Sequence, residues 1–314
     1  MSFERIAIIG LGLLGGSIGL AVREYLPGAT TTGYDADPAV RIRAAERKLA
    51  DRICETAADA VREADLVIFC VPVGAMGASA AEVAGALPKD ALVSDVGSSK
   101  QTVARELAEA LPGQAIIPAH PVAGTEHSGP DAGFASLFQQ RWCIITPPKG
   151  ADGALVGQLG AFWEALGARV EVMDPEHHDL VLAVTSHLPH LIAYTIVGTA
   201  DELETVTRSE VLKFSAGGFR DFTRIAASDP TMWRDVFLAN KDAVLEMLGR
   251  FNEDISLLTK AIRKDDGDAL FEHFTRTRAI RKGIVQIGQD SPAPDFGRPH
   301  PDLPHEPLPK PYEN

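Results

Sequence analysis

The stretch AIIGLGLLGGSIGLA, residues 7–21, decides the fold of the N-terminal part of the chain. Its glycines Gly10, Gly12 and Gly15 match the spacing G-x-G-x-x-G, and residues 5–9 before them predict a short buried strand. In a dinucleotide-binding fold these glycines permit a tight turn, a close approach of the pyrophosphate to the backbone, and packing of helix on strand. The helix that follows offers free N–H groups and its positive dipole end to the pyrophosphate. We therefore interpret this stretch as a phosphate-binding loop.

A second predicted strand begins at Thr30 and ends at Asp35, which lies 20 residues after Gly15. An acidic residue at this distance accepts hydrogen bonds from the adenosine ribose hydroxyls and repels a 2′-phosphate, which favours NAD over NADP. The alternative is that Asp35, or Asp37, only caps a helix that begins near Pro38. The order of strand, glycines, helix, strand and acid predicts NAD as the cofactor. The expected cofactor contacts are the glycine loop, the first residues of its helix, the acid and the end of a later strand: Gly10, Gly12, Leu13, Leu14, Gly15, Asp35, Val71 and Pro72.

The composition excludes several classes of protein. Hydrophobic residues make up 45% and charged residues 23% of the 314 residues, which is typical of a globular protein with two domains. The net charge of −13 and the lack of a basic cluster argue against a nucleic-acid partner. Cys54, Cys70 and Cys143 have no metal-ligand spacing, and neither a long uncharged apolar span nor a signal peptide is evident. We therefore expect a cytoplasmic protein without a membrane partner.

Strands and helices alternate through the first 173 residues. Further strands are expected at residues 65–73, 91–98, 115–121, 141–147 and 169–173, and further helices at residues 39–50, 75–87, 100–111 and 153–167. The strands are apolar on both faces and are separated by helices. They therefore predict an α/β fold with a Rossmann-type, doubly wound parallel sheet that is covered on both sides.

The pattern becomes helical near residue 174. Helices are expected at residues 175–205, 208–215, 230–262 and 265–286. Their apolar stripes have few local partners, which indicates packing against a second subunit. Eight prolines between Pro292 and Pro311 predict a disordered tail rich in polyproline conformation. We therefore expect an NAD-binding domain over residues 1–173, an all-helical substrate and dimerisation domain over 174–288, and a tail over 289–314.

Polar residues follow strands of the expected sheet, at the edge where an open α/β sheet binds its ligands. They are Ser98, Ser99 and Lys100 after one strand, and His120, Thr125, Glu126 and His127 after another. His120 precedes Pro121, which fixes the local backbone. An imidazole beside a nicotinamide accepts a hydroxyl proton while hydride leaves the same carbon. His120 is therefore the candidate base, the alternative being a solvated surface histidine.

The helical half holds two further groups of candidates. Four histidines within 14 residues invite a metal-site interpretation: His177, His178, His187 and His190. Because Pro189 separates the last two and no cluster of cysteines or acids accompanies them, we expect no metal. Arg220 and Arg224 lie one helical turn apart beside two glycines. They are either exposed ion-pair partners or a guanidinium fork for a substrate carboxylate.

Five motifs occur in the order found in the prephenate/arogenate (cyclohexadienyl) dehydrogenases of tyrosine biosynthesis: GLGLLGGS, DVGSSK, HPVAGTEHSG, SHLPH and GGFRDFTRIAASDPTMWRD. The chain resembles this family over about residues 4–285. The resemblance implies NAD-dependent oxidative decarboxylation of prephenate to 4-hydroxyphenylpyruvate, or of arogenate to tyrosine. It also implies a homodimer whose helical domains intertwine across a two-fold axis.

The resemblance implies roles for individual residues. His120 resembles the catalytic histidine that takes the proton of the ring hydroxyl, and Ser98 resembles the serine that contacts both that hydroxyl and the histidine. Arg224 resembles the arginine that binds the ring carboxylate, and its apolar neighbours Phe222 and Ile225 predict a buried setting. The other expected substrate-binding residues line or close the pocket: His187, Thr125, Glu126 and Trp233.

Two other functions stay open at this point. A hydroxyacid or imino-acid dehydrogenase with a Rossmann and a helical domain would rely on a lysine or on hydrogen-bond donors of the helical domain, whereas the candidate base here follows a strand of the sheet domain. A non-catalytic regulator that senses NAD(H) would need no combination of His120, Ser98 and Arg224. The residues do not separate prephenate from arogenate, because these substrates differ only in a keto or an amino side chain.

Overall fold

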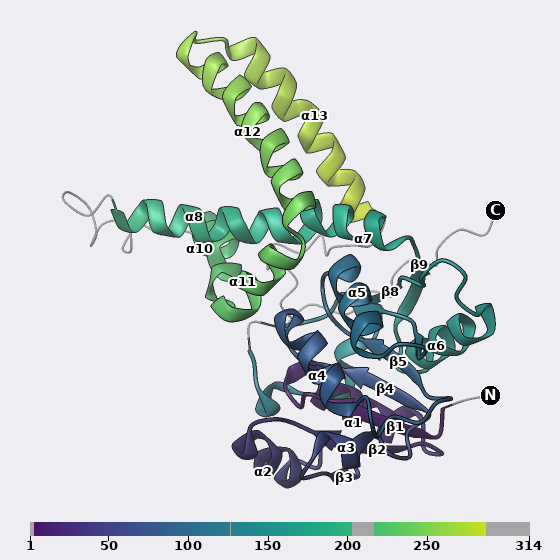
Figure 1. The fold of residues 1–314 in the computed structure, drawn as a ribbon. Helices are drawn as coiled ribbons and strands as arrows, with labels where there is room; N and C mark the ends of the chain where they lie inside the picture. The colour runs from purple at the N-terminus through teal and green to yellow at the C-terminus, as the bar shows by residue number, and fades with distance from the viewer. Residues whose placement is uncertain (1–2, 126, 203–216, 287–314) are drawn as a thin grey trace. The chain divides into compact units, whose positions relative to one another are not determined.

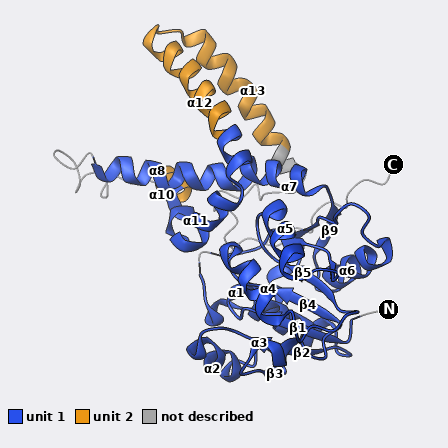
Figure 2. Ribbon diagram, viewed as in Figure 1, with its two compact units in different colours: residues 1–213, 223–247 blue, residues 214–222, 248–314 orange. Residues whose placement is uncertain are grey.

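The computed structural model describes residues 3–125, 127–202 and 217–286 (Figure 1). The chain divides into two compact units, one of residues 1–213 with 223–247 and one of residues 214–222 with 248–314 (Figure 2). This division differs from the domain boundary expected after residue 173. The difference arises because residues 175–202 and 230–239, which follow that boundary, pack within the first unit.

A six-stranded parallel sheet, in the order β3-β2-β1-β4-β5-β6, forms the centre of the first unit. Its strands are β1 (Arg5–Ile9), β2 (Thr30–Tyr34), β3 (Arg52–Ile53), β4 (Leu66–Phe69), β5 (Leu92–Asp95) and β6 (Ala115–Ile116). In the central register Ile6 pairs with Thr31 on one side and with Leu66 on the other. This strand order is that of the Rossmann fold, so the predicted fold class is confirmed.

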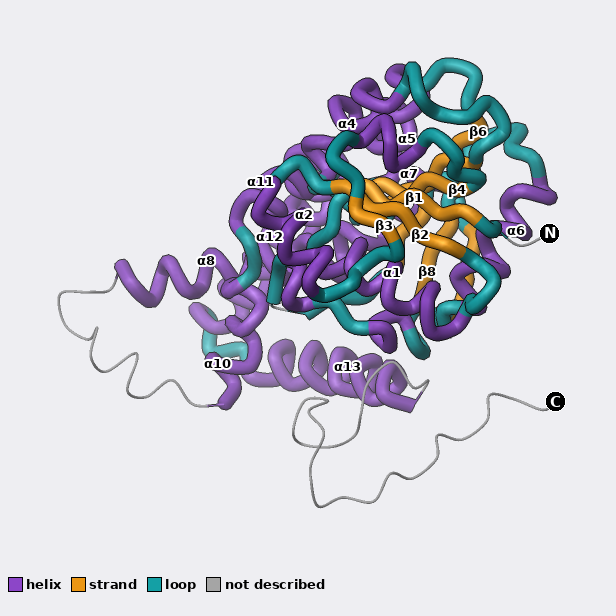
Figure 3. Tube along the Cα trace, turned by 90° about the horizontal axis from the view of Figure 1, so that it is seen from below, coloured by secondary structure: helices purple, strands orange, loops and turns teal. Residues whose placement is uncertain are grey.

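Helices cover both faces of the sheet, as Figure 3 shows for α1 and α4. Successive side chains of β1 point to opposite faces, so Ile6 and Ile8 enter one apolar cluster while Ala7 and Ile9 enter another. The first cluster contains residues of α1 (Leu13–Tyr25) and α6 (Gly153–Ala165). The second contains residues of α3 (Ala57–Val61), α4 (Met76–Val83) and α5 (Lys100–Ala110). Burial on both faces explains why these strands are apolar throughout.

The single strand expected at residues 115–121 is wrong, because the chain changes sheets at Pro118. Ile117 still donates to Val93 of the large sheet, whereas Pro118 accepts a bond from Thr146 in a second sheet. Proline has no N–H to donate to a ladder, so it suits this crossing point. The second sheet has the order β7-β8-β9, with β7 (Ala119–Pro121), β8 (Trp142–Ile145) and β9 (Arg169–Val172).

Strand β8 runs antiparallel to β7 and parallel to β9. The expectation of a wholly parallel arrangement is therefore wrong for this pair. Residues 122–141, which join β7 to β8, hold the short turns η2 (Pro130–Ala132) and η3 (Ala135–Phe138) but no crossover helix among the described residues. A parallel pair needs a long crossover, whereas an antiparallel pair does not.

Helix α2 (Pro38–Glu46) is shorter than the helix expected at residues 39–50. Asp37 caps its N-terminus by accepting a hydrogen bond from the Ala39 N–H. At its other end Lys48 has φ +54°, and the Leu49 N–H bonds back to the Ala44 carbonyl. This is a left-handed helix end formed without glycine, so the sequence carries little sign of it. Strand β3 and helix α3, which follow, were also not predicted.

The long helix expected at residues 175–205 is interrupted. It consists of α7 (Pro175–Leu182), the π-helical segment η4 (Ala183–His187) and α8 (Leu188–Glu202). Contrary to the expectation that no long apolar span exists, residues 175–202 are long and apolar enough to cross a membrane by length and composition alone. Its buried side chains His178, Asp179 and His187 bond to other elements of the first unit. These contacts hold α7 and η4 within the first unit, although only 28% of the apolar window as a whole is buried.

The remaining helices are α10 (Gly217–Thr223), the 3-10 turn η5 (Arg224–Ala227), α11 (Pro230–Ala239), α12 (Lys241–Arg263) and α13 (Gly267–Gln286). The helix expected at residues 230–262 is therefore two helices, with a break at Asn240. Within the first unit, α11 packs on η1 (Val73–Ala75), and the Thr102 hydroxyl donates to the Ala239 carbonyl at 2.8 Å. The helix expected at residues 208–215 and the tail at 289–314 lie outside the described residues.

Candidate active site

The glycine loop after β1 has the shape that a dinucleotide requires. Gly10 has φ +101°, and a Cβ there would lie 2.7 Å from the Cys70 carbonyl oxygen. A Cβ on Gly15 would lie 1.9 Å from the Gly10 oxygen, so neither position accepts another residue. Gly12 is the N-cap of α1, makes no side-chain cap, and has nothing within 4 Å of where its Cβ would be. The first N–H groups of α1 have no intrahelical acceptor, and a helix N-terminus of this kind is a suitable site for a pyrophosphate.

Asp35 lies directly after β2 and holds this loop. Its Oδ2 accepts a hydrogen bond from the Leu11 N–H at 2.8 Å, and its Oδ1 accepts one from the Asp37 N–H at 3.0 Å. Asp35 therefore does not cap α2, and each of its oxygens keeps a lone pair for a ribose hydroxyl.

An arginine also lies close to Asp35. Arg41 donates to the Asp35 carbonyl at 2.8 Å and lies over the Tyr34 ring at 5.6 Å. The sequence shows no arginine directly after Asp35, and the structure supplies one from the first turn of α2. Its guanidinium is engaged by main-chain carbonyls and by the Tyr34 ring, whereas the Asp35 carboxylate faces the glycine loop.

Val71 and Pro72 follow β4, and the main chain of Cys70 and Val71 lies against Gly10. Ser98 follows β5 and is half-buried. Because β1, β4 and β5 are parallel, these residues gather at the carboxyl edge of the sheet. No hydrogen bond between Ser98 and His120 occurs among the described residues, where Nδ1 of His120 faces His178.

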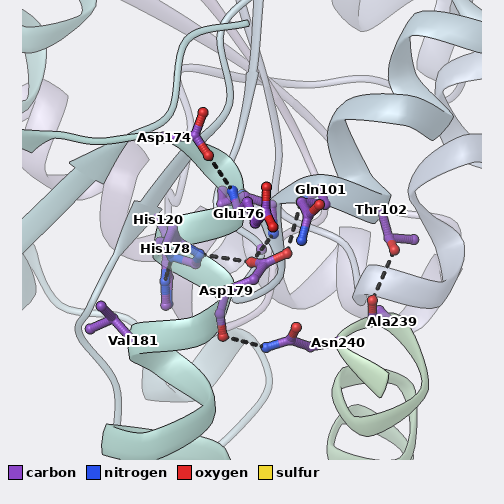
Figure 4. Close-up of polar contacts among 12 residues, drawn as sticks. Gln101, Thr102, His120, Asp174, Glu176, His178, Asp179, Val181, Ala239 and Asn240 are labelled. Carbon is purple, nitrogen blue, oxygen red and sulfur yellow. Dashed lines mark hydrogen bonds and ion pairs between the residues drawn. The ribbon is translucent and has the colours of Figure 1, made fainter. Parts of the chain in front are cut away.

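His120 belongs instead to a chain of hydrogen bonds that reaches into α7 (Figure 4). Its Nδ1 lies 2.8 Å from Nε2 of His178, and Nδ1 of His178 lies 2.8 Å from Oδ1 of Asp179. All three side chains are buried. We call His120, His178 and Asp179 the histidine relay.

The relay fixes where each proton lies. A carboxylate only accepts, so His178 must donate from Nδ1 and, being neutral, must accept at Nε2. His120 therefore donates from Nδ1 and keeps the lone pair of its Nε2, which has no hydrogen-bond partner in the described part of the chain. Burial, and then the nearby His178, Lys100 and His187, hold the pKa of His120 well below 6.5. His120 is thus a neutral imidazole with one free acceptor nitrogen, as a general base requires.

The N-terminus of α5 holds Asp179 in place. Its carboxylate accepts hydrogen bonds from the Lys100 N–H at 2.7 Å and from the Gln101 N–H at 3.0 Å. Burial opposes the charge of Asp179, but the bonds from His178 and from these two N–H groups lower its pKa. A carboxylate at a helix N-terminus also gains from the helix dipole. Asp179 therefore stays ionised and acts as the fixed acceptor of the relay.

A second buried pair holds the strand that carries His120. The Lys100 ammonium donates to Oδ2 of Asp95 and, at 2.8 Å, to the carbonyl of Ala119, the residue before His120. Both charged side chains are fully buried. This pair ties the end of β5 to β7 and so fixes the backbone of the candidate base.

Two more histidines and a tryptophan surround the relay. His187 is buried within η4, and burial lowers its pKa to about 4. The His190 ring stacks on Trp233 with centroids 3.6 Å apart, and the Trp233 ring meets His187 edge-on at 6.0 Å. Burial, with the positive charge of Arg224 nearby, lowers the pKa of His190. Hydrogen bonds and ring contacts hold these histidines, and no group of metal-binding side chains occurs among the described residues.

The buried neutral histidines make stability depend on pH. Because the pKa of His187 is 6.5 when unfolded and about 4 when folded, the unfolded chain binds this proton more readily, and stability falls as the pH drops below 6.5. Each pH unit in this window is worth about 1.4 kcal/mol, so we expect an unfolding free energy about 2 kcal/mol lower at pH 5 than at pH 7.5 from this residue alone. Urea unfolding of the wild type and of His187→Gln at both pH values measures the difference. An equal pH dependence of the two proteins would contradict the assignment.

The other expected substrate residues are less enclosed. Arg224 opens η5 and is exposed in the single chain, so the expectation of a buried arginine is wrong. Phe222, in α10, is also exposed. Thr125 is exposed and bonds to His127, and Glu126 lies outside the described residues.

Reasoning from sequence missed the relay residues His178 and Asp179, and also Asn240. The first two stand in the motif EHHDLV, in which the sequence analysis considers the histidines only as metal ligands. A His-Asp pair followed by an apolar helical run is the signal that was available, because a buried histidine needs a partner. Asn240 carried no signal, since nothing in its local sequence marks the break between α11 and α12.

Comparisons with known proteins agree with this geometry. Residues 18–172 match the family model of the prephenate dehydrogenase nucleotide-binding domain, and residues 174–276 match that of the prephenate dehydrogenase dimerization domain. A cyclohexadienyl dehydrogenase of Zymomonas mobilis is 47% identical over 90% of this chain and 96% of its own length. A prephenate dehydrogenase of Bacillus subtilis is 34% identical over 97% of this chain and 82% of its own.

A solved structure is similar as well. The prephenate dehydrogenase of Aquifex aeolicus, in complex with hydroxyphenyl propionate and NAD+, superposes with a TM-score of 0.84 and 33% identity. The superposition covers 90% of this chain and 99% of that one.

A dinucleotide loop and a neutral histidine base within one compact unit are what a nicotinamide-dependent dehydrogenase needs, and the protein is of that class. The two family models, which together span most of the residues, narrow this further. The chain belongs to the prephenate dehydrogenase family.

Proposed function

We propose that this chain catalyses the NAD-dependent oxidative decarboxylation of prephenate to 4-hydroxyphenylpyruvate, of arogenate to tyrosine, or of both. Its relatives, and the solved relative that holds NAD+, support this reaction. The single observation that supports it most is the free acceptor nitrogen of His120 in β7, whose tautomer the histidine relay sets.

The two alternative functions fit the site less well. A dehydrogenase with a lysine base is disfavoured because Lys100 is fully buried in its ion pair with Asp95. A regulator that only senses NAD(H) has no use for a buried relay that keeps one imidazole nitrogen unprotonated.

In this reaction His120 handles the proton of the ring hydroxyl. NAD, when bound, accepts hydride from the ring carbon that bears this hydroxyl. His120 Nε2 accepts the hydroxyl hydrogen as positive charge develops there, and the Asp179 carboxylate stabilises the resulting charge through His178. The bond to the ring carboxylate breaks, carbon dioxide leaves, and its electron pair completes the aromatic ring. The proton held by His120 then returns to the phenol oxygen, so the enzyme ends in its starting state.

The experiment that tests this function supplies the purified protein with prephenate, arogenate and a set of simple 2-hydroxy acids. NADH formation is followed together with 4-hydroxyphenylpyruvate or tyrosine. We expect NADH and one aromatic product in equal amounts from at least one of the two cyclohexadienes. Oxidation of the 2-hydroxy acids alone would favour the first alternative function, and NAD binding without turnover of any substrate would favour the regulator.

We assign the pyrophosphate to the glycine loop with Leu13 and Leu14, and the adenosine ribose to Asp35, with Val71 and Pro72 beside the riboside. NAD should therefore be used at least roughly tenfold better than NADP in kcat/KM, because the Asp35 carboxylate repels a 2′-phosphate. Asp35→Asn keeps an acceptor for the Leu11 N–H but removes the charge, so it should narrow this preference.

The control for that prediction is Asp37→Ser. Asp37 caps α2 two residues away, and serine caps a helix as well. Equal or better use of NADP by the unmodified protein would contradict the assignment of Asp35, since Arg41 would then be serving the phosphate.

For the substrate we assign the ring carboxylate to Arg224, with Ser98, Thr125 and Glu126 as further contacts, and with His187 and Trp233 lining the pocket. The charge of Arg224 acts on His190, which stacks on Trp233, so this arginine lies beside the aromatic wall. Arg224→Ala should raise KM for the substrate at least roughly tenfold, because a charge-assisted bond to a carboxylate is worth about 1.5–3 kcal/mol. Arg224→Lys should restore only part of the affinity, since an ammonium lacks the planar fork.

Arg220→Ala is the control for that measurement. Arg220 lies one turn earlier, is exposed, and pairs with Asp221 at 3.7 Å. An unchanged KM in Arg224→Ala together with a raised KM in Arg220→Ala would show that the carboxylate anchor is Arg220.

We further propose a cytoplasmic homodimer in which residues 1–173 bind NAD and residues 174–288 supply the dimer contacts. The second unit exposes large apolar side chains that a partner subunit would cover: Leu257, Ile262, Phe271 and Phe274. The match to the dimerization-domain model supports this assembly. Analytical ultracentrifugation tests it, and a monomer at micromolar concentration would contradict it.

A further inference from the structure

Asn240 is a buried residue at the break between α11 and α12. Only 3% of it is exposed, and its backbone leaves the helical conformation at φ −109° and ψ 33°. Its side chain reaches across to α7, where Nδ2 lies 2.7 Å from the main-chain oxygen of Asp179 (Figure 4). The same nitrogen lies 3.1 Å from Nδ1 of His187. One amide group therefore contacts both the histidine relay and a second histidine.

The contact with Asp179 sets the orientation of the Asn240 amide. A main-chain carbonyl oxygen can only accept, so the atom facing it must be the amide NH2 and not the amide oxygen. This NH2 has two hydrogens, one for the Asp179 carbonyl and one for His187, and it has no lone pair to offer. Nδ1 of His187 must then be the acceptor, so the hydrogen of the neutral imidazole lies on Nε2.

That hydrogen has no acceptor in the described part of the chain. Nε2 of His187 is buried and makes no hydrogen bond to the described residues. A buried donor without an acceptor is costly and rare in folded proteins. His187 is close enough to His120 to act on its pKa, and its ring meets Trp233 edge-on. The unused donor therefore lies in the substrate region beside the candidate base.

We propose that Asn240 is a positioning residue that holds His187 in the Nε2–H form, so that His187 donates a hydrogen bond to an oxygen of the bound substrate. This inference rests on the proposed function for the identity of the ligand, but not for the state of His187. The ring carboxylate, the hydroxyl and the side-chain carboxylate of a cyclohexadiene all offer such an acceptor. Without Asn240 the imidazole would be free to place its hydrogen on Nδ1, and Nε2 would then meet an acceptor oxygen with a lone pair.

The direct test is the tautomer of His187 in the NAD-bound wild-type protein. Long-range proton–nitrogen NMR spectra of protein labelled with ¹⁵N-histidine distinguish a protonated Nε2 from a protonated Nδ1, and the His187→Gln variant assigns the signal. We expect protonation at Nε2 at pH 7.5. Protonation at Nδ1, or fast exchange between the two forms, would overturn the proposal. This measurement needs neither turnover nor a variant at Asn240, so it is separate from the test of the proposed function.

The second test replaces Asn240 by aspartate, which has the same shape but no hydrogen to donate. The carboxylate of the aspartate can only accept a hydrogen bond from Nδ1 of His187. The imidazole hydrogen of His187 therefore moves to Nδ1, and Nε2 can no longer donate. We expect the His187 signal to change to the Nδ1-protonated form and KM for the substrate to rise at least tenfold, with NAD affinity unchanged. Asn252→Asp, which makes the same change of charge on the exposed surface of α12, should alter neither quantity.

Two results would overturn the proposal. An unchanged KM in Asn240→Asp despite the altered tautomer would show that the substrate does not use this donor. A loss of NAD affinity with unchanged substrate KM would place the acceptor on the cofactor.

Discussion

Replacement of His120 by asparagine is expected to lower kcat by roughly 10²- to 10⁴-fold, which is the range that a general base contributes. Asparagine keeps a polar group near Nδ1, and its amide can still donate to His178. It offers nothing at the position of Nε2, so the ring hydroxyl loses its acceptor. The affinity for NAD should change little, because the glycine loop and Asp35 are separate from this residue.

Steady-state kinetics with the better of the two substrates measure this effect, and NAD titration by fluorescence provides the control. The relay residues are unchanged in His190→Gln, so that variant is the control for the loss of a neighbouring, half-buried imidazole. A His120→Asn enzyme with near-normal kcat would show that the proton goes to another group.

Replacement of Asp179 by asparagine is expected to lower kcat by roughly 10²- to 10⁴-fold as well, by reversing the relay. With its amide oxygen in the place of Oδ2, asparagine still accepts the Gln101 N–H but loses the bond from the Lys100 N–H, which Oδ1 accepts in the wild type. Its NH2 then faces His178 and donates where the carboxylate accepted. His178 turns to the opposite tautomer, and His120 must carry its hydrogen on Nε2, where the base needs a lone pair.

The matched control for this reversal is Asp174→Asn. Asp174 caps α7 through the Glu176 N–H at 2.8 Å, and asparagine caps a helix as well as aspartate. We expect Asp174→Asn to retain wild-type kcat, and Asp179→Asn to lose kcat with little change in KM. A raised KM with normal kcat in Asp179→Asn would mean that Asp179 shapes the pocket but does not orient the base.

Local patterns predicted most of the large sheet. Short segments contain the features that decide the fold: the glycine loop, Asp35 and the alternation of apolar strands with helices. Residues 5–35 alone are therefore enough to predict the fold class. The split at Pro118 and the antiparallel pairing of β7 with β8 were missed because they depend on which segments meet in space. Proline marks a point where a ladder cannot continue, but it does not say where the chain goes next.

In the candidate site, too, contacts between segments far apart in the chain could not be predicted from local sequence. His120 was predicted from its place after a strand, whereas its partner His178 lies 58 residues further along the chain. The local spacing of the histidines in α7 and η4 bears only on whether they bind a metal. The relay of His120, His178 and Asp179 becomes visible only in the packing of α7 against α5. The expected burial of Arg224 failed for a related reason, since apolar neighbours in sequence do not enclose a residue when the segment is a single turn.

The most direct test of the central claim, that neutral His120 accepts the proton of the ring hydroxyl, is the pH dependence of hydride transfer. Single-turnover mixing of the NAD-bound enzyme with substrate gives this rate constant as NADH appears. The account predicts a rate constant that is level near neutral pH and falls tenfold per pH unit only below a pKa under 6.5, because burial keeps His120 unprotonated. It also predicts that this fall disappears in His120→Asn. A fall that begins at or above pH 6.5, or one that persists unchanged in His120→Asn, would contradict the account.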